Sequence, residues 1–182
     1  GYPWKVQVSI LYTLDAAGFK CEMWGVNQSE SCAPFACGWH PYFALSSADT
    51  VDKCSLKLQN CEETIADKQL CPTSSKTHPG FDCSIKDLKL DTAFRIGKFS
   101  ISDPVTVSEA LTASPIPSKC STTRVAGPGA TIALWQDTSF PFVQIYTPDD
   151  RTCIAIEPTS GPPNSFNVPE NEEQYFVLKK KA

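Results

Sequence analysis

The sequence predicts an all-β protein built as an antiparallel β-sandwich. Apolar and polar residues alternate with a period of two through several short segments, and no window of useful length carries an apolar stripe at the helical period. Fifteen prolines and nine glycines among 182 residues punctuate these segments, as is typical of short strands joined by turns. With 41% hydrophobic residues, residues 1–182 can form a core, and no internal repeat or domain boundary divides them.

The N-terminal strands are predicted as a hairpin. Residues 15–18, Asp-Ala-Ala-Gly, form its turn, and one apolar face runs through Val6, Val8, Ile10, Tyr12 and Leu14 and returns through Phe19, Cys21 and Met23. Further strands are expected over 55–59, 85–90, 131–136, 141–147, 153–157 and 174–178, with a strong turn at 147–151. The best helical candidate is 62–70, which is short. Segments 71–79 and 112–128 are rich in Ser, Thr and Pro and are expected as long surface loops.

Charge and hydropathy argue against several kinds of partner. The formal net charge is −4 and the pI is near 5.2, so the basic surface typical of nucleic-acid or anionic-membrane binding is missing. The dense basic run at 179–181 is interpreted as a solvated tail. No apolar stretch approaches the roughly 18 residues of a membrane-spanning helix. Residues 1–5 do not form a signal peptide, so a secreted form would already be processed.

Nine cysteines are scattered at positions 21, 32, 37, 54, 61, 71, 83, 120 and 153. No pair has the close C-x-x-C spacing of zinc ribbons or redox motifs, and with two histidines zinc would need mostly thiolate ligands. Disulfides in an oxidising compartment, and hence a secreted or extracellular protein, are predicted instead. The odd count leaves one cysteine free or bonded outside the chain. The sequon Asn27-Gln28-Ser29 predicts glycosylation at Asn27.

His40 is the first candidate for chemistry. It lies in the segment Gly38-Trp39-His40-Pro41-Tyr42-Phe43, where Pro41 fixes the backbone and the aromatics Trp39 and Tyr42 can wall a pocket. Local sequence alone favours the plainer interpretation, a partly buried histidine that a backbone carbonyl satisfies.

Glu157 is the second candidate. It ends an apolar strand, shares a face with Cys153 and Ala155 by alternation, and meets Pro158 at once. A carboxylate at the end of a buried strand is costly unless it is paired or functional, and the stiff loop 161–164, Gly-Pro-Pro-Asn, can hold it still. The alternative is a salt-bridged or capping glutamate.

The remaining polar candidates are weaker. Asp91 is expected at the end of a strand, where an aspartate is usually a turn former, and His78 is expected to be solvent-exposed in a polar loop. The chain has no G-x-S-x-G elbow, phosphate-binding glycine loop or H-E-x-x-H motif. A histidine and a carboxylate on opposite sides of a small substrate suit proton transfer better than formation of a glycosyl-enzyme.

Four segments, in the same order along the chain, resemble the aldose 1-epimerase (galactose mutarotase-like) family. The segment 1–14 resembles the strand before the family's histidine loop, and 38–43 is similar to its Gly-Trp-His-Pro-Tyr-Phe motif. The segment 90–94, Leu-Asp-Thr-Ala-Phe, resembles the Asp-x-x-Phe sugar-binding segment. The segment 156–167 resembles the motif Glu-Pro-x-Thr-Gly-Pro-Pro-Asn-x-Phe-Asn, with Ser160 as a departure from it.

The resemblance implies a mutarotase. Glu157 would be the general base toward the anomeric hydroxyl of an aldose, and His40 the general acid toward the ring oxygen. Asp91 would hold sugar hydroxyls, and the motifs make Trp39, Tyr42 and Asn164 further substrate-binding candidates. No cofactor or metal is expected because only protons move. The implied fold is the galactose mutarotase-like supersandwich, an antiparallel β-sandwich.

The resemblance also implies that residues 1–182 form a partial sandwich, the second half of a longer domain. The first half supplies a further histidine and an arginine that cannot be placed in this sequence, because the only other histidine, His78, follows His40. A missing N-terminal segment or a second chain would complete the sandwich and cover its apolar faces.

Two other functions stay open from the sequence. One is a non-catalytic extracellular carbohydrate-binding or structural protein on the same fold, which the partial length and the many cysteines favour. The other is a glycoside hydrolase or lyase on a similar sandwich. Retention of His40, Asp91 and Glu157 favours the epimerase.

Overall fold

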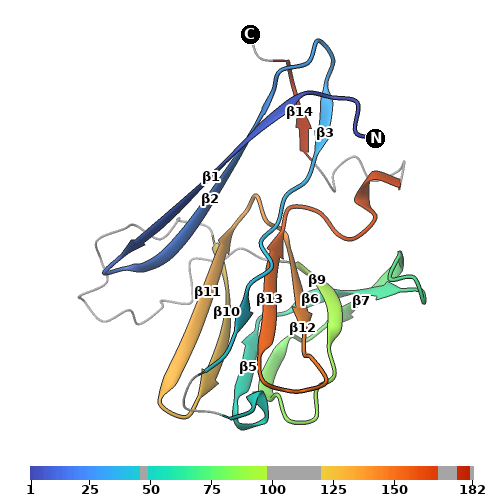
Figure 1. Cartoon of the computed structure of the whole chain (residues 1–182). Helices are drawn as coiled ribbons and strands as arrows, with labels where there is room; N and C mark the ends of the chain where they lie inside the picture. The colour runs from blue at the N-terminus through green and yellow to red at the C-terminus, as the bar shows by residue number, and fades with distance from the viewer. Residues whose placement is uncertain (46–48, 98–119, 168–175, 181–182) are drawn as a thin grey trace.

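The computed structural model describes residues 1–45, 49–97, 120–167 and 176–180. Two larger antiparallel sheets lie together in the lower part of Figure 1. The four-stranded sheet has the order β11 (Ala130–Asp137), β10 (Cys120–Gly127), β5 (Ser55–Leu58), β8 (Phe81–Ser84). The six-stranded sheet has the order β4 (Tyr42–Phe43), β13 (Ile154–Thr159), β12 (Phe142–Tyr146), β9 (Asp91–Ile96), β6 (Cys61–Ala66), β7 (Pro72–His78).

The core lies between these two sheets. One face of the six-stranded sheet contributes Phe94, Val143, Ile145, Ile154 and Ile156 to a single buried cluster. The four-stranded sheet contributes Leu56, Val125 and Leu134 to the same cluster. Burying these side chains is the main stabilising contribution. It also leaves the opposite face of the six-stranded sheet available for a site.

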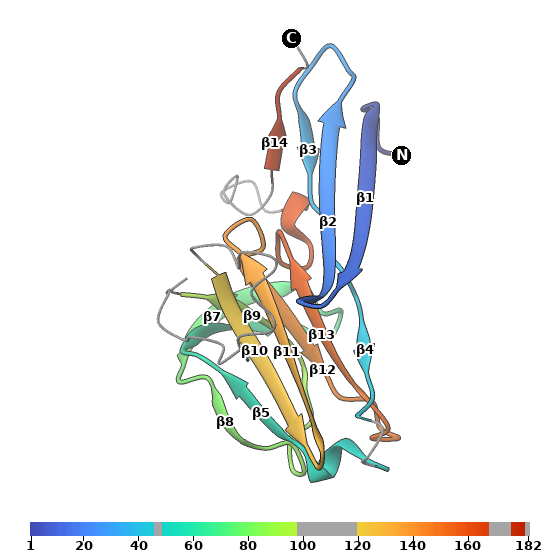
Figure 2. The ribbon, with the colours of Figure 1, turned by 90° about the vertical axis from the view of Figure 1, so that its left-hand side faces the viewer.

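Two smaller sheets lie at the other end of the molecule, with both chain ends (Figure 2). One is the hairpin of β1 (Val6–Asp15) and β2 (Gly18–Asn27), and the other pairs β3 (Ala33–Phe35) with β14 (Phe176–Leu178). The apolar face of β1 is open, since Val8, Ile10, Tyr12 and Leu14 are 51%, 51%, 55% and 79% exposed. These side chains form an apolar sheet surface that no other described residue covers.

The antiparallel all-β prediction is confirmed, and so are several individual elements. The predicted hairpin matches β1 and β2, and the segments 55–59, 131–136, 141–147 and 153–157 match β5, β11, β12 and β13. The turn at 147–151 closes with the Arg151 amide donating to the Pro148 carbonyl, 3.0 Å away. Of the segment 174–178, residues 176–178 form β14, and the rest lies outside the described residues.

Four local predictions are wrong, and in the first three strand pairing outweighs local composition. The helical candidate 62–70 begins as β6, which pairs with both β7 and β9. The expected loop 71–79 is β7, a polar strand at the sheet edge, where lysine and an initial proline are tolerated. In the expected loop 112–128, residues 120–127 form β10 between β11 and β5, and 112–119 lie outside the described residues. The expected strand 85–90 is a connection between β8 and β9.

The disulfide prediction is not borne out. All nine cysteines lie in the described part of the chain, and each is a free thiol. Cys54 and Cys61 are packed in the core cluster as small apolar side chains, and burial raises the pKa of the Cys61 thiol to about 11.

Asn27 has a structural position that does not suit glycosylation. Asn27 is 2% exposed, and its side-chain Nδ2 donates hydrogen bonds to the carbonyls of Ser31 and Leu178 at 2.7 and 3.0 Å. The Asn27 side chain therefore holds the end of β2 against the turn at Ser31 and against β14.

Among the described residues, no helix is long and apolar enough to cross a membrane.

Candidate active site

The segment 37–43, termed here the histidine loop, runs antiparallel to β13 and its continuation at Ser160. Phe43 pairs with Ile154, Tyr42 with Ala155, and Gly38 forms a bridge with Thr159. These pairs keep one register, and in that register His40 lies directly opposite Glu157. Strands pair only in discrete registers, and a slip of one residue would turn one of the two side chains to the other face.

His40 and Glu157 form a non-hydrogen-bonded pair of the antiparallel ladder. On one side the Trp39 amide donates to the Pro158 carbonyl at 3.1 Å, and on the other the Ile156 amide donates to the Pro41 carbonyl at 3.4 Å. Backbone hydrogen bonds therefore flank His40 and Glu157, which form the non-hydrogen-bonded pair, where opposing side chains come nearest. His40 Nε2 lies 3.3 Å from Glu157 Oε1.

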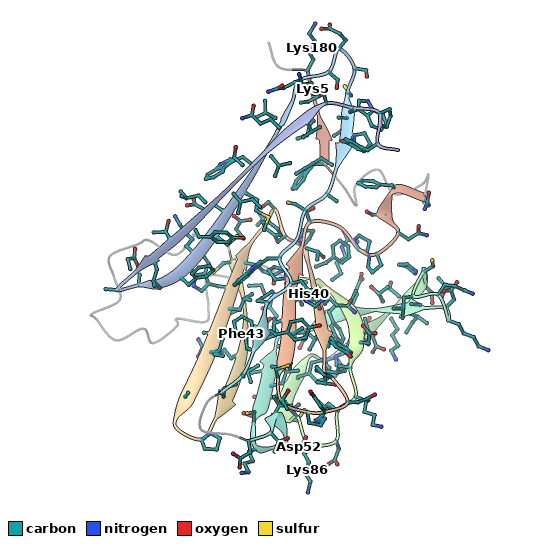
Figure 3. All side chains as sticks on the ribbon, viewed as in Figure 1. Lys5, His40, Phe43, Asp52, Lys86 and Lys180 are labelled. Atoms are coloured by element: carbon teal, nitrogen blue, oxygen red, sulfur yellow. The ribbon has the colours of Figure 1, made fainter. Side chains whose placement is uncertain are left out.

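The two partners have different environments. The Glu157 side chain is 11% exposed and the His40 side chain is 55% exposed. Burial raises the pKa of the Glu157 carboxyl above its ordinary value, the nearby Asp91 raises it further, and the His40 imidazole opposes both. A carboxylate held in this way is a stronger base than one in water. Figure 3 shows His40 at mid-height of the molecule, on the sheet rather than at a loop tip.

A cavity of about 420 Å³ opens over this face of the six-stranded sheet. Two adjacent cross-strand rows form its floor. The first contains His40, Glu157, Gln144 and Ala93, and the second contributes Tyr42, Tyr146 and Asp91. Residues 161–163, the Gly-Pro-Pro turn, line its rim. The alternation that sends Ile156 and Ile145 into the core therefore sends Glu157, Gln144 and Tyr146 into the cavity.

Asp91 begins β9 instead of ending a strand, and it reaches the cavity floor. Its Oδ1 accepts a hydrogen bond of 2.8 Å from Gln144 Nε2. The other end of that amide, Gln144 Oε1, is buried and has no hydrogen-bond partner within the described part of the chain. An unpaired buried acceptor is costly, so the cavity offers a place for a hydroxyl donor beside a carboxylate.

Tyr42 lies against the imidazole of His40. The two rings are 5.0 Å apart between centroids with an interplanar angle of 25°, and Tyr42 meets Tyr146 edge-on at 6.5 Å. Tyr42 also lines the cavity. Aromatic rings of this kind also suit the apolar face of a sugar ring.

Two residues expected near the site lie elsewhere, and a third residue, His78, differs from its expected setting. Trp39 projects to the other side of the sheet, because it alternates with His40, and packs against Phe19 and Phe43. Asn164 is not in the cavity lining; it has φ +59°, and its Oδ1 accepts a hydrogen bond from Asn167. His78 is on β7, packed against Phe81 and Phe94 with its side chain 20% exposed, so the expectation that it is solvent-exposed in a loop is wrong.

Sequence reasoning missed Gln144 and Tyr146. Both belong to the predicted strand 141–147, and a glutamine two residues before a tyrosine on one face of an otherwise apolar strand is the signal that could have found them. Their partners across the sheet, Ala93 and Asp91, depend on strand pairing that composition does not reveal.

A buried carboxylate opposite an exposed imidazole, on the floor of a small cavity, is an arrangement that can carry out acid/base chemistry on a small polar molecule. The sequence profile described as aldose 1-epimerase matches residues 1–181. The chain belongs to the aldose 1-epimerase family.

Individual relatives agree with this assignment. The Escherichia coli (strain K12) protein YihR, described as uncharacterized, is 27% identical over 180 residues, which is 92% of this chain and 50% of YihR. A galactose mutarotase-like protein from Clostridium acetobutylicum superposes with a TM-score of 0.74 at 17% identity, over 98% of this chain and 53% of its own. A galactose mutarotase related enzyme from Lactobacillus acidophilus superposes with a TM-score of 0.69 at 16% identity, over 100% and 59%.

The structural matches establish the galactose mutarotase-like sandwich as the fold. The chain spans about half the length of the relatives it matches.

Proposed function

We propose that residues 1–182 carry the acid/base pair of an aldose 1-epimerase-like enzyme, which interconverts the α and β anomers of an aldose. The observation that supports this most directly is the His40 Nε2–Glu157 Oε1 separation of 3.3 Å on the floor of a cavity of about 420 Å³. A volume of that size is within the usual range of roughly 300–1,000 Å³ for small-molecule sites.

The proposed reaction moves protons only. Glu157 takes the proton of the anomeric hydroxyl while protonated His40 gives a proton to the ring oxygen, and the bond between C1 and the ring oxygen breaks. The resulting open-chain aldehyde rotates about C1–C2. The two groups then act in reverse, and ring closure on the other face of the aldehyde gives the other anomer. Each positioned acid or base contributes about 10²- to 10⁴-fold.

The residues of the cavity floor favour a sugar as the substrate. Asp91 and the unpaired Gln144 Oε1 supply acceptors for hydroxyl donors, and the rings of Tyr42 and Tyr146 supply apolar surface. A polar site that pairs its buried groups with hydroxyls rejects analogues lacking them. Asp91 and Gln144 are therefore proposed to bind the sugar, and Tyr42 to pack against it.

We further propose that more of the sandwich, from an N-terminal segment of the same polypeptide or from a second chain, covers the open apolar face of β1. The half-length match to the relatives and the exposure of Val8, Ile10, Tyr12 and Leu14 support this. Apolar surface of this extent usually marks an interaction site. The cover is also proposed to supply the remaining polar groups around the sugar.

NMR exchange spectroscopy on the anomers of glucose and galactose tests the function. The intact protein should accelerate anomer exchange, and Glu157→Gln should abolish the acceleration while the fold is retained. Glu157→Gln leaves the volume of the side chain unchanged, so lost activity is attributable to the lost base. Sugar binding without acceleration would favour the non-catalytic carbohydrate-binding alternative.

A further inference from the structure

We infer that Ser160 is a positioning residue for the acid/base pair: its hydroxyl fixes the register between the histidine loop and β13, and so holds His40 opposite Glu157. This inference deepens the proposed function and rests on it. Ser160 is 4% exposed and is absent from the cavity lining, so any effect on chemistry passes through other residues.

The need for such a residue follows from two prolines. In an antiparallel ladder each hydrogen-bonded pair exchanges two backbone bonds. Here Pro158 lies opposite Trp39 and Pro41 lies opposite Ile156, and proline has no N–H to donate. Each of these pairs therefore has a single backbone bond, of 3.1 and 3.4 Å. The register beside the reacting groups is thus held by half the usual number of bonds.

The next pair along, Cys37 with Ser160, has both of its bonds. The Ser160 amide donates to the Cys37 carbonyl at 2.9 Å. In the other direction the Cys37 amide donates to Ser160 Oγ at 2.8 Å, so the side chain takes the place of a backbone carbonyl. Ser160 therefore makes two hydrogen bonds with Cys37, the residue that begins the histidine loop.

At Gly38 the histidine loop and β13 approach too closely for a larger side chain. A Cβ at Gly38 would lie 2.9 Å from Thr159 Cγ2 and 3.2 Å from the Pro158 carbonyl oxygen. The histidine loop and β13 are therefore in close contact one residue away from the Cys37–Ser160 pair, termed here the clasp. Ser160 and Cys37 are each three positions from the reacting pair in this register, so a shift at the clasp is passed directly along two paired strands.

The test compares Ser160→Ala and Ser160→Thr with the parent in the intact protein. Ser160→Ala should lower kcat for anomer exchange about 10- to 100-fold with KM changed less than about twofold, because misplacement of about 1 Å costs roughly that much. Its pH–rate profile should also change, with the acid limb displaced upward, because the imidazole that opposes the rise in the Glu157 pKa lies farther away. Ser160→Thr keeps the hydroxyl and should restore most of kcat and the parent profile.

Ser121→Ala is the matched control. Ser121 is 3% exposed and its Oγ accepts a hydrogen bond of 3.1 Å from Gln59 Nε2, in the four-stranded sheet. It should lose comparable stability without moving kcat or the pH profile. If Ser160→Ala lowers kcat no more than Ser121→Ala, or if its loss comes without a change in the pH profile, the inference is overturned.

A readout without turnover separates this inference from the proposed function. The chain has two histidines, so the ring resonances of His40 can be assigned with His78 as an internal reference. In Ser160→Ala the His40 ring resonances should shift and those of His78 should not. An inactive parent with this shift would overturn the proposed function and support the clasp; unchanged His40 resonances would overturn the clasp.

Discussion

His40 and Glu157 face each other as a non-hydrogen-bonded pair of an antiparallel ladder, with His40 Nε2 3.3 Å from Glu157 Oε1. Strand pairing sets this distance, since the register that places Tyr42 beside Ala155 also places His40 beside Glu157. The buried carboxylate lies at the sheet and the exposed imidazole lies above it. The arrangement makes Glu157, the close approach at Gly38 and the Asp91–Gln144 pair the features whose replacement should change activity.

Replacing the base should remove activity without removing the fold. Glu157→Gln is expected to slow anomer exchange by about 10²- to 10⁴-fold. Because burial opposes the charged form of Glu157, the neutral amide should leave the melting temperature unchanged or raised. Exchange NMR and thermal unfolding check both statements. Retained activity would show that another group is the base.

The pH dependence of activity should reveal the raised pKa of Glu157. The base acts when deprotonated, so kcat/KM should fall as pH drops through a pKa above the ordinary glutamate value of 4.5. An acid limb centred at or below that value would contradict the burial argument.

Stability should change with pH in the opposite sense. The folded state binds the Glu157 proton more tightly than the unfolded state, so this stabilising contribution is complete below pH 4.5 and is lost as pH rises through the folded pKa. Denaturant titrations across that window should show a smaller decline for Glu157→Gln than for the parent. Equal declines would mean that Glu157 ionises normally.

Gly38→Ala should disturb the site through packing. The added methyl would meet Thr159 Cγ2 at 2.9 Å and the Pro158 oxygen at 3.2 Å. The Pro158 oxygen belongs to the backbone and cannot move without shifting β13, so a loss of about 1–3 kcal/mol in unfolding free energy is expected, with a fall in kcat. Gly97→Ala is the control, since its Cβ would have only the Asn60 oxygen nearby, at 3.9 Å. Equal effects of the two variants would rule out the close-approach argument.

Gln144→Leu should weaken sugar binding more than chemistry. It removes the 2.8 Å hydrogen bond to Asp91 and the free acceptor Oε1. KM is expected to rise at least about tenfold with a smaller change in kcat, as for a contact made equally in the bound and transition states. Steady-state exchange kinetics check this. An unchanged KM would place the sugar away from the Asp91–Gln144 pair.

Asn27 should prove structural. Asn27→Ala removes three side-chain hydrogen bonds, two donated to the carbonyls of Ser31 and Leu178 and one accepted from the Ser29 amide, and a loss of about 1–3 kcal/mol in unfolding free energy is expected. Thermal unfolding measures the loss. Intact mass of the protein from its source should show no glycan on Asn27; a glycan there would mean that this corner folds differently.

The strands that the sequence predicted correctly are those with clear alternation. The face shared by Val6, Val8 and Ile10 and the apolar run at 153–157 needed no partner to be recognised, because the period of two is a local property. The motifs around His40 and Glu157 were also local, and so was the expectation that Glu157 shares a face with Cys153 and Ala155. Polar strands failed for the same reason: β7 and β10 carry too few apolar residues to alternate, and only their neighbours in the sheet hold them extended.

From the sequence alone came the all-β class, the two motifs that contain the proposed acid and base, and the family that those motifs resemble. Only the folded structure shows that His40 stands opposite Glu157, that Gln144 joins Asp91, that Trp39 turns away, and that none of the nine cysteines forms a disulfide within the chain. The physical reason is that residue type and period fix which face a side chain takes within its own strand. The neighbour it meets depends on pairing and register between distant segments, which the energy of the whole sheet and its core selects.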